Sequence, residues 1–304
     1  MKREHKHRHL NKRKTLITLI ILVLIIIPSI IFLPDFFFHQ SNDIVVTPYT
    51  VTSSKIPPAF KGYKIAFLSD LHITDSLLYN QVVENCRDLK PDIVVISGDL
   101  IDSSSPEQGY YKPYVLAFAK KLSAIAPVYW VTGNYEASIS NSDFSSLKNS
   151  LKLYDFHYLD NTTVPIIKNN QKINLCGIKD PLFGIENIIG DSNDNVVTIK
   201  SYLSESLPQD ISSVFTILAA HRTEYCETIA ESGIDLLLTG HAHGGQIRIP
   251  LIGAVFAPGQ GLFPKYTSGQ FKIKNTQLIV NRGVGGSRFK LRLFNQPEIV
   301  LITL

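Results

Sequence analysis

Short polar motifs that each follow an apolar run constrain the fold of this chain more than any other feature. The runs occupy residues 63–69, 92–97, 128–132, 214–220 and 234–239. The polar groups that end them are Asp70-Leu71-His72, Gly98-Asp99, Gly133-Asn134-Tyr135-Glu136, the lone His221 and Gly240-His241-Ala242-His243. Apolar runs of this length, bounded by turn residues, are typical of buried strands. The sequence therefore predicts that all five polar groups lie at strand ends.

Helical patterns alternate with the first three runs, near residues 77–90, 110–124 and 143–152. This alternation predicts βαβ units, in which helices cover a parallel sheet. A hairpin is expected around Asn169-Asn170. Later strands, which we expect to be antiparallel, fall at 246–249, 271–274, 277–281 and 298–303. The chain is therefore predicted to be an α/β protein with two packed sheets and helices outside them.

The positive charge of the chain is concentrated at its beginning. Residues 1–14 carry seven Lys or Arg and one Glu, a net charge of +6. The whole chain is +4, which leaves −2 for residues 15–304. A nucleic-acid-binding protein concentrates positive charge on its folded domain, so we expect no nucleic-acid partner, and a nuclease is disfavoured.

Residues 15–34 are twenty residues without a charge, mostly Leu, Ile and Val. As a helix they would span about 30 Å, the thickness of bilayer hydrocarbon. We predict a transmembrane anchor at 15–34, a linker at 35–60 and a folded domain at 61–304. The basic tail at 1–14 should stay cytoplasmic, which places the domain outside the cell membrane. A cleaved signal peptide is the alternative, but no small-residue cleavage pattern follows the run.

Aspartate, asparagine and histidine recur in the strand-end motifs. Four of the five histidines after residue 40 stand in them, the exception being His157. One such histidine alone would more often be an ordinary core or surface residue. Strand ends meet at one edge of an α/β sheet, and these side chains are ligands for divalent transition metals. Their joint placement predicts a two-metal hydrolytic centre.

The motifs, in this order, resemble those of the calcineurin-like metallophosphoesterase superfamily over about residues 60–304. The run 240–246, together with Asn281-Arg282-Gly283, resembles its membrane-associated bacterial branch, which includes YkuE-like and UDP-2,3-diacylglucosamine pyrophosphatase-like proteins. The resemblance implies a four-layer α-β-β-α sandwich. It also implies cleavage of a phosphoester or pyrophosphate bond by a hydroxide held on two metals.

The resemblance also implies a ligand for each position of a dinuclear site. The first metal would be held by Asp70, His72 and His243. The second would be held by Asn134, His221 and His241, with Asp99 bridging both. This ligand set, which contains no thiolate, permits Mn, Fe, Zn or Co. Asp99 and Asn134 are expected to be catalytic through these metals.

Tyr135 is a departure from the family pattern, which usually has histidine there to protonate the leaving group or stabilise the transition state. A phenol, with an ordinary pKa of about 10, is a weaker acid at neutral pH. The change favours a good leaving group, such as a phosphate released from a pyrophosphate, or it lowers activity. The other interpretation is that Tyr135 only packs beside the site. The sequence does not decide between a chemical role and packing. Glu136 is expected to contact the metal ligands at most, and not the metals themselves.

Two arginines are candidate substrate-binding residues, Arg222 beside His221 and Arg282 in the later motif. Their guanidinium groups could clamp a phosphate, although a solvated arginine is the commoner outcome. Apolar residues at 251–263 either form a lip for an acyl chain or belong to the core.

The favoured function is that of a membrane-anchored phosphohydrolase. Its expected partner is a phosphorylated small-molecule or lipid substrate, such as a lipid- or nucleotide-linked phosphate. The alternative is a metal-binding pseudoenzyme or scaffold of the cell envelope, weakened by Tyr135. The oligomeric state is not predicted by the sequence.

Overall fold

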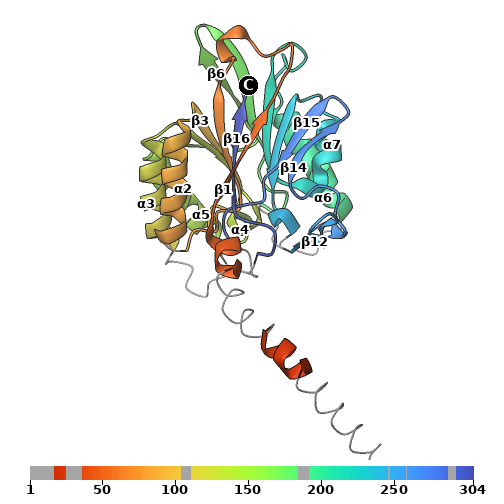
Figure 1. Cartoon of the computed structure of the whole chain (residues 1–304). Helices are drawn as coiled ribbons and strands as arrows, with labels where there is room; N and C mark the ends of the chain where they lie inside the picture. Colours follow the sequence, from red (N-terminus) through yellow and green to blue (C-terminus); the bar gives the residue numbers. More distant parts are fainter. Residues whose placement is uncertain are drawn as a thin grey trace, which may run out of the picture.

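Two six-stranded sheets pack face to face in the structure, which is a computed structural model (Figure 1). It describes residues 17–24, 36–74, 76–103, 111–183, 192–245, 247–257, 259–286 and 292–304. Helices lie outside both sheets, so the layers follow the predicted order α-β-β-α.

The first sheet has the order β1-β16-β2-β3-β4-β5. Its strands are β1 (Val45–Thr50), β16 (Glu298–Thr303), β2 (Lys64–Leu68), β3 (Ile93–Ser97), β4 (Val128–Val131) and β5 (Phe156–Tyr158). Strands β2 to β5 run parallel, whereas β16 is antiparallel to β2. The parallel strands are connected, as predicted, through α2 (Ser76–Leu89), α3 (Tyr111–Ser123) and α5 (Asn141–Lys152).

The second sheet has the order β14-β15-β9-β8-β7-β6. Its strands are β14 (Gly269–Ile273), β15 (Thr276–Val280), β9 (Leu236–Gly240), β8 (Thr216–Arg222), β7 (Gln171–Gly177) and β6 (Thr162–Lys168). Its outer face is covered by α6 (Ser192–Ser206) and α7 (Cys226–Ala230). The predicted β6–β7 hairpin is confirmed, and both residues of its Asn169-Asn170 turn have positive φ, as a type I′ turn requires.

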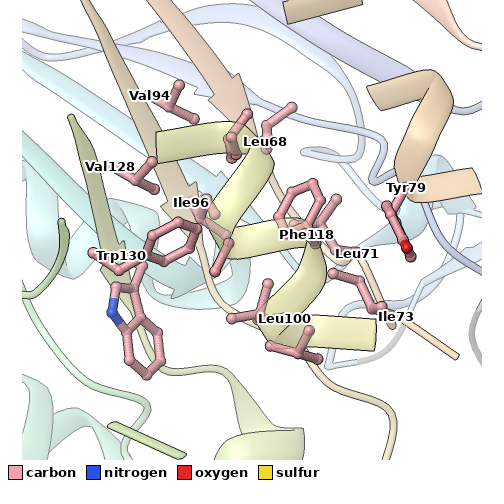
Figure 2. Close-up of a cluster of buried hydrophobic side chains, with 14 of the residues drawn as sticks. Leu68, Leu71, Ile73, Tyr79, Val94, Ile96, Leu100, Phe118, Val128 and Trp130 are labelled. Carbon is pink, nitrogen blue, oxygen red and sulfur yellow. The ribbon is translucent and has the colours of Figure 1, made fainter. Parts of the chain in front are cut away.

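Both faces of the central strands are buried. In β2, Leu68 packs with Ile96, Trp130 and Phe118 between the first sheet and its helices (Figure 2). The preceding residue, Phe67, points the other way, into the cluster between the two sheets. Strands that are covered on both faces read as continuous apolar runs rather than alternating ones, which explains why the sequence pattern was so clear.

Two sequence predictions need correction. The stretch 35–60, predicted as a linker, contains β1, which pairs in parallel with β16 at the edge of the first sheet. Pro48 in the middle of β1 hid this strand, because proline is tolerated in edge strands but weakens a strand pattern. The prediction of antiparallel later strands is right for β14 with β15 but wrong for β15 with β9, which are parallel.

The N-terminal prediction falls largely outside the described residues. Residues 17–24 and 36–42 are helical, whereas 1–16 and 25–35 are not among the described residues. In the parts of the chain that the structure does describe, no helix combines the length and apolar character needed to cross a membrane. The predicted span at 15–34 is therefore not confirmed.

Candidate metal centre

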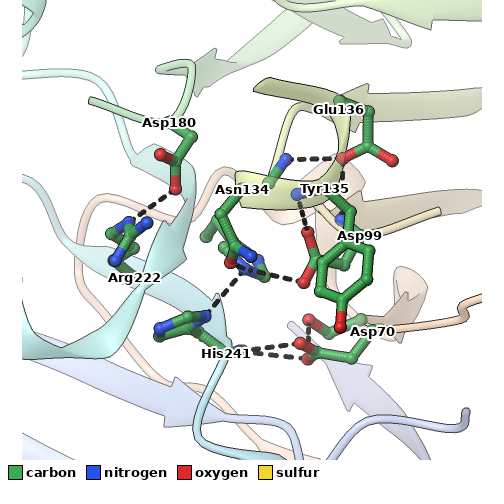
Figure 3. Close-up of polar contacts among 12 residues, drawn as sticks. Asp70, Asp99, Asn134, Tyr135, Glu136, Asp180, Arg222 and His241 are labelled. Carbon is green, nitrogen blue, oxygen red and sulfur yellow. Dashed lines mark hydrogen bonds and ion pairs between the residues drawn. The ribbon is translucent and has the colours of Figure 1, made fainter. Parts of the chain in front are cut away.

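The polar motifs meet at one edge of the two sheets, as their positions at the ends of β2, β3, β4, β8 and β9 predicted. The loops after β2 and β3 run side by side, because the N–H of Asp70 donates to the carbonyl of Gly98 and that of His72 to the carbonyl of Asp99. Side chains from the first sheet thus lie against His221, His241 and His243 from the second sheet. Figure 3 shows His241 beside Asp70 and Asn134.

The backbone at this edge is strained. Five residues with metal-ligand side chains have φ between 42° and 65°: Asp70, His72, Asp99, His241 and His243. This left-handed conformation costs a residue with a Cβ about 1–2 kcal/mol. Such strain is retained where surrounding contacts fix the backbone, and it is concentrated at functional sites.

Glycine is needed where the two ligand-bearing loops of the first sheet touch. A Cβ at Gly133 would collide with the carboxylate of Asp99. Gly98, with φ of 88°, would place a Cβ against His221 and Gly133. Close approach therefore requires glycine at both positions, and the positive φ of Gly98 adds a conformational reason there.

The first ligand cluster consists of Asp70, His72 and His243. Nε2 of His72 lies 3.3 Å from Nε2 of His243, which in turn lies 3.4 Å from Oδ1 of Asp70. All three residues are at least 96 % buried. Burial and the charge of neighbouring His72 and Arg292 hold the pKa of His243 well below its usual range, so its imidazole is neutral. Two imidazole nitrogens and a carboxyl group that converge in this way could hold a divalent cation.

The second cluster consists of Asp99, His221 and His241, joined by Asn134. Nε2 of His221 lies 3.2 Å from Oδ2 of Asp99, 3.1 Å from Oδ1 of Asn134 and 3.1 Å from Nδ1 of His241. The other ring nitrogen, Nδ1, lies 2.8 Å from the carbonyl of Ser97 and donates to it, which directs Nε2 at the cluster. Burial, together with the charge of His221, holds the pKa of His241 well below its usual range.

Asp99 lies between the two clusters. Its Oδ2 is 3.2 Å from Nε2 of His221 and 3.7 Å from Nε2 of His72. Burial acts to raise the pKa of Asp99, but His221 outweighs it and the net pKa lies well below the usual range. A carboxylate that stays ionised between two ligand clusters fits a ligand shared by two cations.

Cation binding at the second cluster should displace a proton from His221. Burial opposes charge on this ring, but Asp99 and Asp70 outweigh burial and raise its pKa to about 10. The ring must lose that proton before Nε2 can bind a cation. The apparent affinity should therefore rise about tenfold per pH unit between about pH 6 and pH 8, with one proton released. Calorimetric titration in buffers of different ionisation enthalpy measures both quantities, and a pH-independent affinity would contradict the prediction.

Glu136 has a larger role than the sequence indicated. This fully buried carboxylate accepts hydrogen bonds from three backbone amides: Gly133 at 2.7 Å, Asp99 at 2.9 Å and Ile101 at 3.0 Å. Figure 3 shows Glu136 beside Asp99. Burial and the nearby Asp99 raise its pKa to about 7, while the amide donors oppose that rise. Glu136 therefore ties the loop that carries Asp99 to the loop that carries Asn134.

Tyr135 contacts residues of both ligand clusters. Its backbone N–H donates to Oδ1 of Asp99 at 2.9 Å. Its ring packs edge-on against His72, with the ring centroids 4.5 Å apart. The phenol therefore stands beside the first ligand cluster (Figure 3).

The two predicted substrate arginines differ in their surroundings. Arg222 is enclosed by carboxylates, donating from Nε to Asp180 at 2.7 Å and from Nη1 to Glu224 at 3.1 Å. Arg222 is therefore a partner of two acids, buried Asp180 and partly buried Glu224, and its role as a phosphate clamp stays a prediction. Arg282 donates from Nη2 to Glu298 at 3.0 Å, whereas its buried Nε has no hydrogen-bond partner among the residues that the structure describes. A role for Arg282 at the substrate stays a prediction.

A pocket of about 220 Å³ opens beside His72. Its walls are partly apolar, with Leu78 and Val284, and it contains Arg292, which the sequence did not single out. Arg292 is fully buried, and Nη1 donates to the carbonyl of Arg282 at 3.0 Å. The pocket extends to Asn42 in the helix at 36–42.

Known proteins share this sequence pattern. The family model of calcineurin-like phosphoesterases matches residues 63–245. Metallophosphoesterase YkuE of Bacillus subtilis (strain 168) is 29 % identical over 86 % of this chain and 85 % of its own length. Phosphodiesterase YaeI of Escherichia coli (strain K12) is 27 % identical over 80 % of this chain and 82 % of its own. A transmembrane protein with a metallophosphoesterase domain from Bos taurus is 28 % identical over 85 % of this chain and 56 % of its own.

The fold, the two ligand clusters and the family match lead to one assignment. The family uses divalent metals, and the chain offers two candidate sites for them. The chain belongs to the calcineurin-like phosphoesterase family and is a metal-dependent phosphoesterase.

Proposed function

We propose that this protein is a membrane-anchored phosphohydrolase that cleaves a phosphoester or pyrophosphate bond with two divalent cations. The observation that carries the proposal is Asp99, an ionised buried carboxylate whose Oδ2 faces His221 of one cluster and His72 of the other. When bound, a pair of divalent cations polarises phosphoryl oxygens and lowers the pKa of water.

The residues of the chain divide this work. Asp70, His72 and His243 would hold one cation, and Asn134, His221 and His241 the other, with Asp99 shared. Backbone amides hold Asp99 and Glu136 in place, so the ligand geometry is organised before substrate arrives. The phenol of Tyr135, next to His72, is placed to donate a hydrogen bond at the leaving-group side.

We propose the pocket beside His72 as the place for the part of the substrate that lies beyond the phosphate. Leu78 and Val284 provide apolar contacts, and Arg292 provides positive charge near the site. A phosphate linked to a lipid or a nucleotide has this combination of an apolar or aromatic group and negative charge. Because Tyr135 replaces a stronger acid, we favour a substrate with a good leaving group, such as a pyrophosphate.

The anchor is proposed from the twenty uncharged residues at 15–34 and the basic tail before them. The bovine relative is itself named a transmembrane protein. The proposed topology has the tail in the cytoplasm and the phosphoesterase domain outside. A reporter enzyme fused after Leu304 tests it, and reporter activity on the cytoplasmic side would overturn the proposed orientation.

The experiment that tests hydrolysis uses the full chain in detergent, stripped of metal and then titrated with manganese. We would follow an activated aryl phosphodiester and a sugar-nucleotide pyrophosphate. We expect turnover that is absent from the stripped protein, saturates near two cations per chain and favours the pyrophosphate. Turnover that persists unchanged without metal would contradict the proposal.

The alternative function, a metal-binding pseudoenzyme, is decided in the same assay with Tyr135→His. The observation that favours this alternative is that Tyr135, which packs against His72, occupies a position where the family usually has histidine. Binding of two cations without turnover in the natural protein, together with a large gain in Tyr135→His, would favour the pseudoenzyme. An active natural protein with a change of less than about tenfold in the variant would favour the enzyme.

A further inference from the structure

Six large apolar side chains are exposed together on two short hairpins and a neighbouring loop. The hairpins are β10 (Arg248–Ile249) with β11 (Gly253–Ala254), and β12 (Phe256–Ala257) with β13 (Gly261–Leu262). We call the six residues the apolar rim: Leu251, Ile252, Phe256, Leu262, Phe263 and Phe294. Each of them is at least 47 % exposed, and Leu251 is fully exposed. The sequence left open whether 251–263 was core or a lip, and this exposure excludes core for five of its residues.

The exposure of the apolar rim is built into the backbone. Leu251, Phe263 and Phe294 have φ of 69°, 50° and 51°, which is a costly conformation for bulky residues. The N–H of Arg248 donates to the carbonyl of Leu293, and that of Phe263 to the carbonyl of Val255. These hydrogen bonds fix the backbone of the segments that carry the exposed side chains.

The apolar rim is continuous with the metal centre on one side. The ligand His243 begins the short helix η3 (His243–Gly245), which is followed closely by β10. Asn295, next to Phe294, donates from its side-chain amide to the carbonyl of His243 at 2.7 Å. The rim and the cation ligands thus share one edge of the molecule.

On the other side the apolar rim meets the N-terminal segment. The ring of Phe36 lies 5.8 Å from that of Phe294. Phe36 is the first described residue of the helix at 36–42, and in sequence it follows the apolar run at 15–34 after Asp35. Figure 1 shows this orange helix at the same end of the molecule as β12 and α4 (Asn134–Ala137). The chain that is proposed to enter the membrane therefore leaves the domain beside the rim.

The segment that contains the apolar rim is basic in sequence, although Lys265, Lys274 and Arg282 each pair with an acid outside it. Residues 236–297 contain eight Lys or Arg and no Asp or Glu, although residues 15–304 as a whole carry −2. Basic residues next to exposed Leu and Phe side chains are typical of segments that bind at the interface of an anionic bilayer.

We propose that the apolar rim inserts into the interfacial layer of an anionic lipid bilayer, so that the metal centre opens toward the membrane surface. The inference deepens the proposed function and rests on its membrane anchor. A site held in this position would take phosphorylated substrates whose apolar part stays in the bilayer, without full extraction of that part into water.

The test uses the full chain reconstituted in vesicles of phosphatidylcholine and phosphatidylglycerol. An environment-sensitive fluorophore is attached at Leu251→Cys or, in a second variant, at Phe263→Cys. The three natural cysteines are buried, which makes labelling selective. The matched control is Ile167→Cys on β6, which is 67 % exposed and lies at the opposite end of the molecule (Figure 1). We expect blue-shifted emission and at least about twofold quenching by spin-labelled lipid at 251 and 263, and neither at 167.

Other outcomes overturn the inference in distinguishable ways. Water-like emission at all three positions, in protein that floats with the vesicles, contradicts docking but leaves the anchor intact. Protein that does not float with vesicles contradicts the anchor itself. A blue shift at 251 and 263 that depends on protein concentration and not on lipid assigns the apolar rim to contact with a second copy of the chain. An equal blue shift with a monomeric short-chain lipid in place of vesicles assigns the apolar rim to the binding of a single acyl chain.

Discussion

Asp99→Asn should lower kcat/KM by at least about a thousandfold while the protein stays folded. The amide keeps an oxygen to accept the hydrogen bond from the N–H of Tyr135, so the loop retains its contact. It loses the negative charge that faces His221 and His72 at 3.2 Å and 3.7 Å. We expect weaker binding of both cations, because one side chain serves both clusters. Steady-state kinetics and metal content after dialysis measure the two effects.

The matched control for this variant is Asp155→Asn. Asp155 is an exposed aspartate whose carboxylate pairs with His157 at 2.8 Å, away from the metal centre. Exposed ion pairs of this kind contribute little, so activity and metal content should stay within about twofold of the parent. If Asp99→Asn retained more than a tenth of the parental kcat/KM, the shared-ligand role would be refuted.

Glu136→Ala should have the largest effect on stability of any single substitution near the site. It leaves three buried backbone amides, those of Asp99, Gly133 and Ile101, without their acceptor. An unsatisfied buried donor costs about 1–3 kcal/mol, so we expect a loss of about 3 kcal/mol or more. For a domain of this size the loss corresponds to a fall in Tm of about 6–12 °C.

The activity of Glu136→Ala should also fall, by about 10–100-fold, because Asp99 and Asn134 would no longer be held relative to each other. Glu231→Ala is the control, since Glu231 is exposed and forms one surface ion pair with Lys274. Its Tm should change by less than about 2 °C. Glu136→Gln, which keeps one acceptor oxygen, should lie between the two. Equal Tm values for Glu136→Ala and Glu231→Ala would show that the three hydrogen bonds contribute nothing.

The site was predictable from the sequence where its chemistry coincides with a strand end. Each ligand motif follows an apolar run, and a strand that is buried on both faces leaves a pattern that needs no partner to be identified. The positions of His221 at the end of β8 and of Gly240-His241-Ala242-His243 at the end of β9 could therefore be inferred before any contact was known.

The parts that sequence reasoning missed depend on contacts between distant residues. Glu136 is important through backbone amides as far as 37 residues away, and an amide leaves no mark in the sequence. Arg222 pairs with Asp180 across 42 residues, and nothing local distinguishes that outcome from binding a phosphate. For the apolar residues at 251–263 the sequence left core and lip open, and five of them are exposed on or beside two short hairpins.

Each ligand cluster takes side chains from both sheets, Asp70 and His72 with His243 in one, and Asp99 with His221 in the other. Sliding of one sheet over the other would therefore change the ligand geometry at both clusters at once. The relative position of the sheets is set by the side chains packed between them, such as Phe67 and Leu238. A displacement of about 1 Å at a reacting centre can cost about a hundredfold in rate. Packing between the two sheets thus sets the distances between the metal ligands. A substitution that changes the volume of this interior would therefore alter catalysis without changing a ligand.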